Sequence, residues 1–146
     1  MDFSFFTTNN KSGYKTNEKW LEKNHQGVLL HKMQDSSSFR GARNSVKVPA
    51  DFIGIIDGRP LMIECKETIS DRLYVSHFKK DHQVEALEQW RNSGGIAGYI
   101  VMLWKINSVF WIPISKLNSL VIVNRDTLLT RQVFPYIRLQ ELIHVV

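Results

Sequence analysis

The sequence has a single cysteine and no long hydrophobic run. Because Cys65 has no second cysteine to pair with, an internal disulfide is excluded, which fits a reducing cytoplasm. No uninterrupted apolar stretch reaches the roughly 18 residues that a membrane-spanning helix requires. The opening MDFSFFTTNNKSG has only a short apolar patch and no basic leader, so it predicts no secretory signal. We therefore expect a cytoplasmic protein with no membrane partner.

Acidic residues are scarce in the first third of the chain. The segment from Lys11 to Ala50 has three of them (Glu18, Glu22 and Asp35) against eight basic ones, so 8 − 3 = +5 equals the net charge of the whole protein. Such a basic stretch is typical of a surface that binds a polyanion, most often nucleic acid. The alternative is a basic surface that contacts only water. The basic residues are Lys11, Lys15, Lys19, Lys23, Lys32, Arg40, Arg43 and Lys47.

The first half of the chain predicts a helix followed by strands. A length of 146 residues favours a single domain, residues 1–146. A cap at Thr16 or Asn17, an apolar side from Trp20 and Leu21, and a stop at Gly27 predict a helix over 16–27. A short strand follows over 27–33. Serine, glycine and basic residues over 34–49 predict a flexible basic loop. Apolar runs on either side of Asp57-Gly58 then predict a β-hairpin with a two-residue turn.

The second half predicts a helix and a second hairpin. Val84, Leu87 and Trp90 recur at helical spacing, with Asp81 expected to cap the helix and Gly94-Gly95 to end it. Two apolar runs around Asn107-Ser108 predict the second hairpin, and Ser115 is expected to cap a short helix. Strands that alternate with helices in this order predict an α/β fold with a central mixed β-sheet flanked by helices.

Charged residues gather at one end of the first hairpin. If the turn pairs Ile56 with Arg59, the same register brings Asp51 opposite Glu64. Lys66 shares a strand face with Glu64, because side chains alternate along a strand. Two close carboxylates repel each other unless a cation lies between them, and hard oxygen ligands favour Mg²⁺ or Mn²⁺. These residues predict a site that cleaves phosphodiesters; the alternative is a cross-strand salt bridge that serves only the fold.

Zinc and cysteine chemistry are not favoured. The five histidines lack the spacing of metal ligands, and Cys65 is expected to point to the core as a small hydrophobic residue. The histidines are His25, His31, His77, His82 and His144.

The pattern around these residues resembles a known nuclease family. The pattern is similar to the PD-(D/E)xK signature, with PAD followed after twelve residues by ECK. The stretch from Val48 to about Trp104 resembles the RecU-type Holliday-junction resolvases, on the strength of ADFIGIIDGRPLMIECKET and the later HQVEALEQW. The resemblance implies a restriction-endonuclease-like core and a homodimer that cuts four-way DNA junctions by paired symmetric incisions in recombination. It also implies Mg²⁺, with Mn²⁺ able to substitute, and products with 5′-phosphate and 3′-hydroxyl ends. A small stand-alone resolvase would suit a virus or a mobile element.

The same resemblance implies roles for individual residues. Asp51 and Glu64 would bind the metal, with the backbone carbonyl of Cys65 as a further oxygen, and Gln83 falls where the family has a glutamine near the metal. Lys66 would stabilise the phosphate and orient the attacking water. For Gln83 the alternative is an ordinary polar residue in the first turn of a helix.

A first-helix acid often completes such a site. Glu18 occupies that place, with Glu22 as the competing choice, and either could instead pair with a nearby lysine. The chain differs from the RecU group at Pro49, where that group usually has a hydroxyl residue, and the loop over 34–48 is short and basic where the group has a long insertion.

Basic residues near the site are candidates for DNA contact. Alternatives to a junction resolvase are a nuclease of the same fold that acts on duplex DNA in restriction or repair, and a DNA-binding module that does not cut. Cleavage that depends on Mg²⁺ would exclude the binding module, whereas unchanged binding in Asp51→Asn without any cleavage would favour it. The candidate DNA contacts are Arg40, Arg43 and Lys47 in the basic loop, and Lys79 and Lys80 before the second helix.

Overall fold

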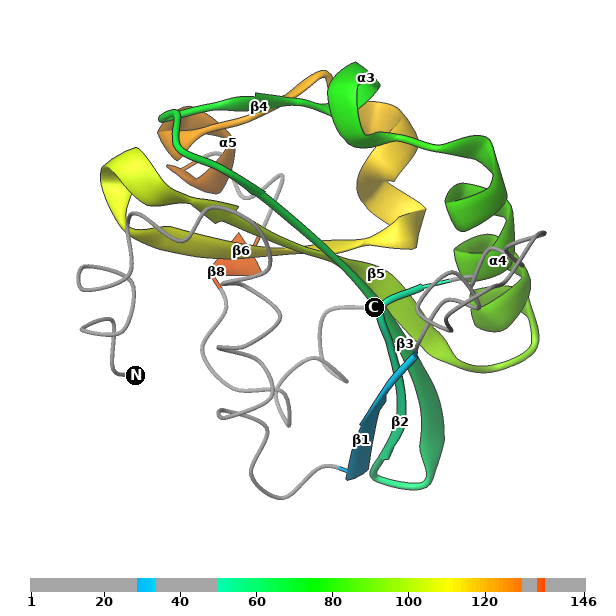
Figure 1. Cartoon of the computed structure of the whole chain (residues 1–146). Coiled ribbons are helices and arrows are strands. Elements are labelled where there is room, and N and C mark those ends of the chain that lie inside the picture. Colours follow the sequence, from blue (N-terminus) through cyan, green and yellow to red (C-terminus); the bar gives the residue numbers. More distant parts are fainter. Residues whose placement is uncertain (1–28, 34–49, 130–133, 136–146) are drawn as a thin grey trace, which may run out of the picture.

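A six-stranded mixed β-sheet forms the centre of the protein (Figure 1). The structure is a computed structural model, and it describes residues 29–33, 50–129 and 134–135. The strands lie in the order β1-β2-β3-β5-β6-β8; β3 and β5 are parallel, and every other neighbouring pair is antiparallel. The expected α/β fold with a mixed sheet is therefore confirmed. The strands are β1 Leu29–Lys32, β2 Phe52–Ile56, β3 Arg59–Thr68, β5 Ile96–Leu103, β6 Ser108–Pro113 and β8 Phe134–Pro135.

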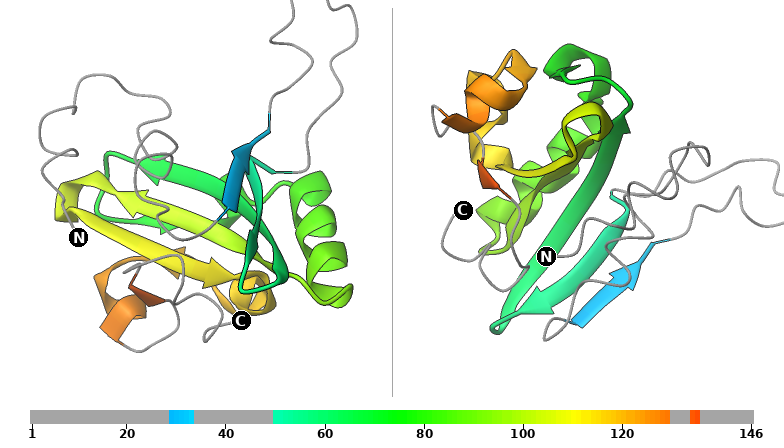
Figure 2. Two further views of the ribbon diagram at one scale, coloured as in Figure 1. Left: turned by 90° about the horizontal axis from the view of Figure 1, so that it is seen from below. Right: turned by 90° about the vertical axis from the view of Figure 1, so that its left-hand side faces the viewer.

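Helices cover one face of this sheet, and a small second sheet lies beside them (Figure 2). Side chains of α3, α4 and η3 pack with alternate residues of β3, β5 and β6 into one buried cluster, and the opposite side chains of the same strands form a second cluster. Within the described ranges, no helix is long and apolar enough to cross a membrane. The remaining elements are β4 Leu73–Tyr74, α3 Val75–Phe78, α4 Asp81–Asn92, η2 Trp104–Ile106, η3 Ile114–Ser119, β7 Ile122–Val123 and α5 Arg125–Leu129.

The hairpin of β2 and β3 has the predicted turn and register. Asp57 and Gly58 have φ angles of 49° and 75°, and positive φ at both central residues is the conformation that a two-residue hairpin turn favours. Ile56 pairs with Arg59, and the pairing continues to Phe52 opposite Ile63. β3 extends to Thr68 and so includes both Glu64 and Lys66.

The second helix and the second hairpin are confirmed, but the predicted cap of that helix is wrong. The residue before α4 is Lys80, which makes no side-chain capping bond, and Asp81 lies in the first turn instead. There its charge still favours the helix N-terminus. Gly94, with φ of 98°, follows the helix as predicted. β5 and β6 pair around η2 and Asn107, which has φ of 48°.

The last predicted helix is present as a 3₁₀-helix that begins one residue early. η3 begins at Ile114 after Pro113, so Ser115 lies inside it and caps nothing. The predicted helix over 16–27 and the basic loop over 34–49 lie outside the described residues.

Candidate active site

Asp51 is held at the start of β2 by its backbone and by its side chain. Its carbonyl oxygen accepts a hydrogen bond of 2.8 Å from the amide of Met33, just after β1. Its carboxylate Oδ2 accepts one of 2.8 Å from the amide of Cys65 in β3. Because the ladder with β3 ends at Phe52, the side chain of Asp51 takes the place of a backbone acceptor for Cys65. The carboxylate is thus fixed beside the residue that follows Glu64.

Glu64 is a buried carboxylate on the face of β3 that α4 covers. Its residue is only 4% exposed. Nε2 of Gln83, from the first turn of α4, donates a hydrogen bond of 2.8 Å to Oε1. Nζ of Lys66 lies 3.2 Å from the same oxygen, as expected for a residue two positions along the strand. Buried carboxylates require such partners, because an unpaired charge in the interior is costly.

Burial changes the acidity of Glu64. Loss of water around the carboxylate raises the pKa of Glu64, while the charge of Lys66 and hydrogen bonds with Lys66 and Asp51 lower it, and the net direction is upward. The interactions with Lys66 and Asp51 therefore offset only part of the cost of burying the charged Glu64 carboxylate. A cation bound beside the carboxylate would offset the rest of that cost.

The residues present fit a divalent metal ion. Oε1 of Gln83 is buried and has no hydrogen-bond partner among the described residues, although it belongs to the amide that contacts Glu64. An oxygen acceptor without a partner, together with two neighbouring carboxylates, is the donor set that Mg²⁺ and Mn²⁺ prefer. Within residues 29–33, 50–129 and 134–135, no three His, Cys, Asp or Glu side chains gather as metal ligands. Among the described residues, the amide oxygen of Gln83 is the further oxygen beside the two carboxylates.

The candidate DNA contacts are only partly described. Nζ of Lys79 donates a hydrogen bond of 3.1 Å to Oδ1 of Asn118 in η3, at an exposed position. Lys80 is exposed directly before α4, the helix that carries Gln83. The other candidate DNA contacts, Arg40, Arg43 and Lys47, lie outside the described residues, as do the candidate first-helix acids Glu18 and Glu22.

Tyr99 is a neighbour of the site that the sequence did not single out. It is the parallel β5 partner of Glu64, is fully buried, and contacts the ring of Phe78 with centroids 5.2 Å apart. Its hydroxyl has no hydrogen-bond partner in the part of the chain that the structure describes. Burial, together with the charges of Glu64 and Glu88, raises the pKa of Tyr99, so the phenol is neutral. No local pattern gives the register of two parallel strands that a helix connects, so the sequence carried no signal for this contact.

Comparisons with known proteins agree on a family and a fold. The family model described as recombination protein U (RecU) matches residues 7–145. Among solved structures, the chain is similar to Hjc of Archaeoglobus fulgidus, a Holliday junction resolvase from an archaeal hyperthermophile, with a TM-score of 0.57 and 14% sequence identity over 90% of this chain and 98% of that one. No curated protein sequence matches the chain. At that identity the structural likeness concerns the fold alone.

Proposed function

Because the chain belongs to the recombination protein U (RecU) family, we propose that it is a metal-dependent endonuclease that resolves four-way (Holliday) DNA junctions during recombination. The proposal includes a homodimer acting in the cytoplasm, since two copies related by a twofold axis would cut two strands symmetrically. Its substrate would be branched DNA, in keeping with the chain's net charge of +5.

One observation carries the proposal: Oε1 of buried Glu64 is shared by Lys66 and Gln83, with Asp51 beside them. The distances are 3.2 Å to Nζ of Lys66 and 2.8 Å to Nε2 of Gln83. A salt bridge that served only the fold would not need a second carboxylate or a buried amide oxygen left without a partner. The arrangement instead suits the binding of a cation and of a phosphate.

Asp51, Glu64, Gln83 and the backbone carbonyl of Cys65 would hold the metal, with Mg²⁺ as the expected ion and Mn²⁺ able to substitute. When bound, such an ion supplies positive charge next to the phosphate and increases the acidity of a water molecule. Gln83 and Lys66 keep the Glu64 carboxylate oriented, and the charge of Lys66 favours its charged form. Glu18 is proposed as a further acid of this site.

Lys66 would act on the phosphate itself. Its ammonium group contacts Glu64 and would also bind a phosphate oxygen and orient the attacking water. The water releases one proton to solvent, and its oxygen forms a bond to phosphorus as the bond from phosphorus to the 3′ oxygen breaks. The 3′ oxygen takes up a proton, which leaves 5′-phosphate and 3′-hydroxyl ends. Arg40, Arg43, Lys47, Lys79 and Lys80 are proposed to bind phosphates farther along the DNA.

Cleavage of a labelled four-way junction beside a matched duplex tests the proposal. Each reaction is run with Mg²⁺, with Mn²⁺ and with EDTA, for the wild type and for Lys66→Ala. Paired symmetric nicks in the junction alone, lost in EDTA and in the variant, are the expected result. Equal cutting of the duplex would keep the catalytic site and reject junction selectivity. DNA binding without any cutting in either metal would instead identify a binding module.

A further inference from the structure

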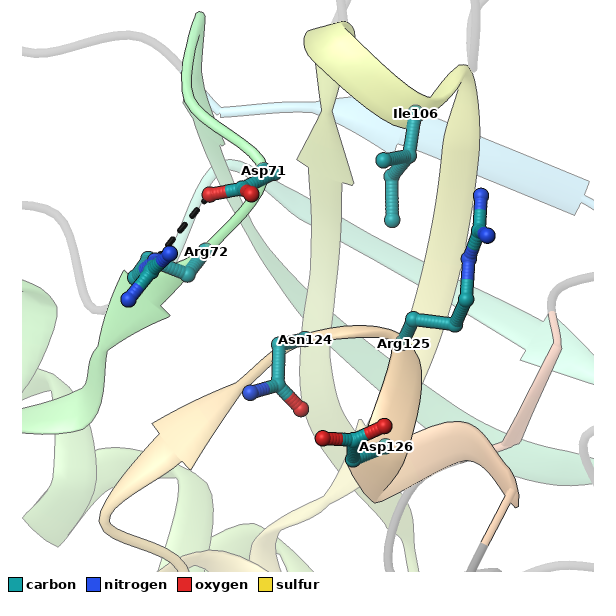
Figure 3. A pocket seen from close by; sticks show the side chains of 6 residues that line it. All are labelled: Asp71, Arg72, Ile106, Asn124, Arg125 and Asp126. Atoms are coloured by element: carbon teal, nitrogen blue, oxygen red, sulfur yellow. Dashed lines mark hydrogen bonds and ion pairs between the residues drawn. The ribbon is translucent and has the colours of Figure 1, made fainter.

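A second polar site lies at the far end of β3 from the hairpin turn. A cavity of about 410 Å³ opens between the segment after β3, the end of η2 and the start of α5 (Figure 3). A volume of this size is within the range of small-ligand sites in proteins. The residues that line the cavity are Asp71, Arg72, Ile106, Asn124, Arg125 and Asp126.

This cavity and the candidate active site are joined by a single strand. Glu64 and Lys66 belong to β3, and Asp71 follows its end by a short bend. The chain from Glu64 to Asp71 spans no more than about 24 Å at ~3.3 to 3.4 Å per residue. Each nucleotide of a duplex strand advances by about 3.4 Å, so the cavity lies within roughly seven nucleotides of a phosphate bound at Glu64.

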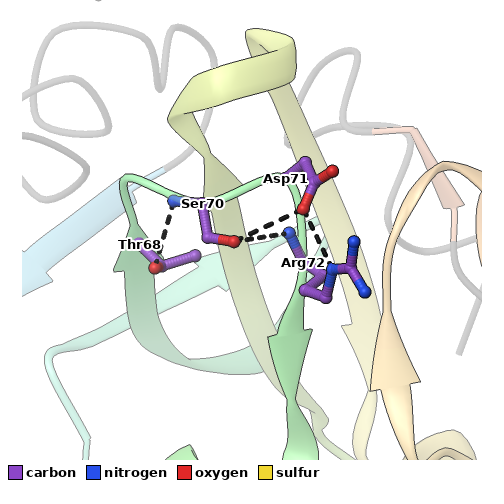
Figure 4. Close-up of polar contacts among 4 residues, drawn as sticks. All are labelled: Thr68, Ser70, Asp71 and Arg72. Atoms are coloured by element: carbon purple, nitrogen blue, oxygen red, sulfur yellow. Dashed lines mark hydrogen bonds and ion pairs between the residues drawn. The ribbon is translucent and has the colours of Figure 1, made fainter.

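One arginine of the cavity is held in place by the bend. Nε of Arg72 contacts Oδ1 of Asp71 at 3.0 Å, and the backbone amide of Arg72 donates a hydrogen bond of 3.3 Å to Oγ of Ser70. The amide of Ser70 in turn donates one of 3.3 Å to Oγ1 of Thr68 at the end of β3 (Figure 4). Asp71 therefore holds the guanidinium of Arg72, which also hydrogen-bonds with the side chain of Tyr74 and points away from Arg125 (Figure 3).

The second arginine of the cavity, Arg125, is available to a ligand. Arg125 is exposed, and no hydrogen bond or ion pair engages its side chain within the described ranges. Asn124, next to it, uses Oδ1 to accept a hydrogen bond of 3.0 Å from the amide of Thr127, which leaves its Nδ2 donor available. Ile106 adds an apolar wall. Donors, acceptors and an apolar surface within one cavity match the parts of a nucleotide better than they match a lone inorganic anion.

We propose that this cavity binds one nucleotide of the DNA strand that lies in the active site, with its phosphate against Arg125 and its sugar and base against Asn124 and Ile106. The proposal rests on the proposed function, because the DNA is the substrate assigned there. It adds an anchor at the end of β3 that fixes the strand relative to the scissile phosphate. The carboxylates of Asp71 and Asp126 would accept hydrogen bonds from base amino groups.

Two variants of the full-length protein test this anchor without disturbing the fold. Arg125→Ala removes an exposed guanidinium, and Asn124→Asp keeps the oxygen that caps α5 while it adds negative charge to the cavity. Arg59→Ala is the matched control, since Arg59 lies at the opposite end of β3. Affinity for a four-way junction is measured in EDTA over a series of salt concentrations, so that binding is read without cleavage.

Arg125→Ala is expected to reduce the slope of log K against log salt by about one, the effect of one lost phosphate contact. Asn124→Asp should weaken binding, and Arg59→Ala should bind as the wild type does. In ethylation interference, we expect one phosphate within about seven nucleotides of the incision to block binding of the wild type when it is ethylated. The same modification should no longer affect binding of Arg125→Ala. If the wild type cuts junctions but both cavity variants keep its affinity and its salt slope, the anchor is overturned and the proposed function is not. A wild type that neither binds nor cuts DNA would overturn the proposed function and the anchor with it.

Discussion

Gln83 reaches from the first turn of α4 to Glu64 on β3, and its Nε2 donates a hydrogen bond of 2.8 Å to Oε1 of the buried carboxylate. The same amide leaves its own Oε1 buried without a partner among the described residues. The helix therefore contributes to the site in two ways, since it orients one ligand and presents another oxygen. A residue 19 positions from Glu64 in the sequence becomes part of its immediate surroundings.

Removal of the Gln83 amide should weaken both the fold and metal binding. Gln83→Ala leaves Oε1 of Glu64 with one partner fewer in a buried place, so we expect a loss of about 1–3 kcal/mol in the free energy of unfolding. The concentration of Mg²⁺ required for half-maximal cleavage should rise. Urea unfolding and a Mg²⁺ titration measure the two effects. Gln89→Ala, at an exposed position of the same helix, is the control. Equal stability of the two variants would contradict the role of the hydrogen bond.

The raised pKa of Glu64 predicts how stability depends on pH in the absence of metal. The folded protein retains this proton at pH values where the unfolded chain, with a usual glutamate pKa of about 4.3, has already released it. The contribution of Glu64 to stability is therefore fully present below the unfolded pKa and is lost as pH rises through the raised folded pKa. Glu64→Gln should remove this part of the pH dependence.

Thermal unfolding in EDTA from pH 4 to pH 8 measures the difference between the wild type and Glu64→Gln. Adding Mg²⁺ should stabilise the wild type increasingly toward the upper end of that range, because metal binding requires the deprotonated carboxylate. Glu85→Gln, exposed on α4, is the control. Parallel pH profiles for the wild type and Glu64→Gln would show that Glu64 does not titrate as its burial requires.

Local sequence signals predicted the half of the site that comes from one hairpin. Asp57-Gly58 fixes a two-residue turn, and a two-residue turn fixes the pairing up to Phe52 and Ile63. Asp51 and Glu64 were therefore placed together by counting from the turn, with no knowledge of the rest of the fold. The prediction was reliable because the contact depends on few residues between its partners.

Contacts that depend on packing between distant segments were not predictable in the same way. The position of Tyr99 beside Glu64 depends on the register of parallel strands connected through α3 and α4, which no turn determines. The cavity near Arg72 and Arg125 also combines segments far apart in the chain. Asp81 was expected to cap α4. Lys80 instead has the extended conformation that precedes the helix, so Asp81 is the first residue of the helix and not its cap.

Loss of the Lys66 ammonium should reduce catalysis more than binding. Lys66→Ala removes the donor proposed for the phosphate, and we expect kcat to fall by about 10²–10³, the usual effect of one lost donor to a developing charge. Affinity for the junction in EDTA should change little. The charge of Lys66 also lowers the pKa of Glu64, so residual activity should have its acidic limb at higher pH. Single-turnover cleavage over a pH series measures both, with Lys116→Ala, at an exposed position of η3, as control. An equal loss in binding and cleavage would assign Lys66 to DNA affinity alone.

Asp51 offers a substitution that separates its structural role from its proposed metal role. Asp51→Asn keeps an oxygen that can accept the hydrogen bond of Cys65, so the free energy of unfolding in EDTA should stay within about 1 kcal/mol of the wild type. The loss of the negative charge should abolish the stabilisation by Mg²⁺ and the cleavage of the junction together. Asp51→Ala should also lose about 1–3 kcal/mol, because the amide of Cys65 is then left without its acceptor. Unfolding curves with and without Mg²⁺ compare the three proteins. A Mg²⁺ shift that survives in Asp51→Asn would remove Asp51 from the metal site, while the hydrogen bond to Cys65 would remain as its role in the fold.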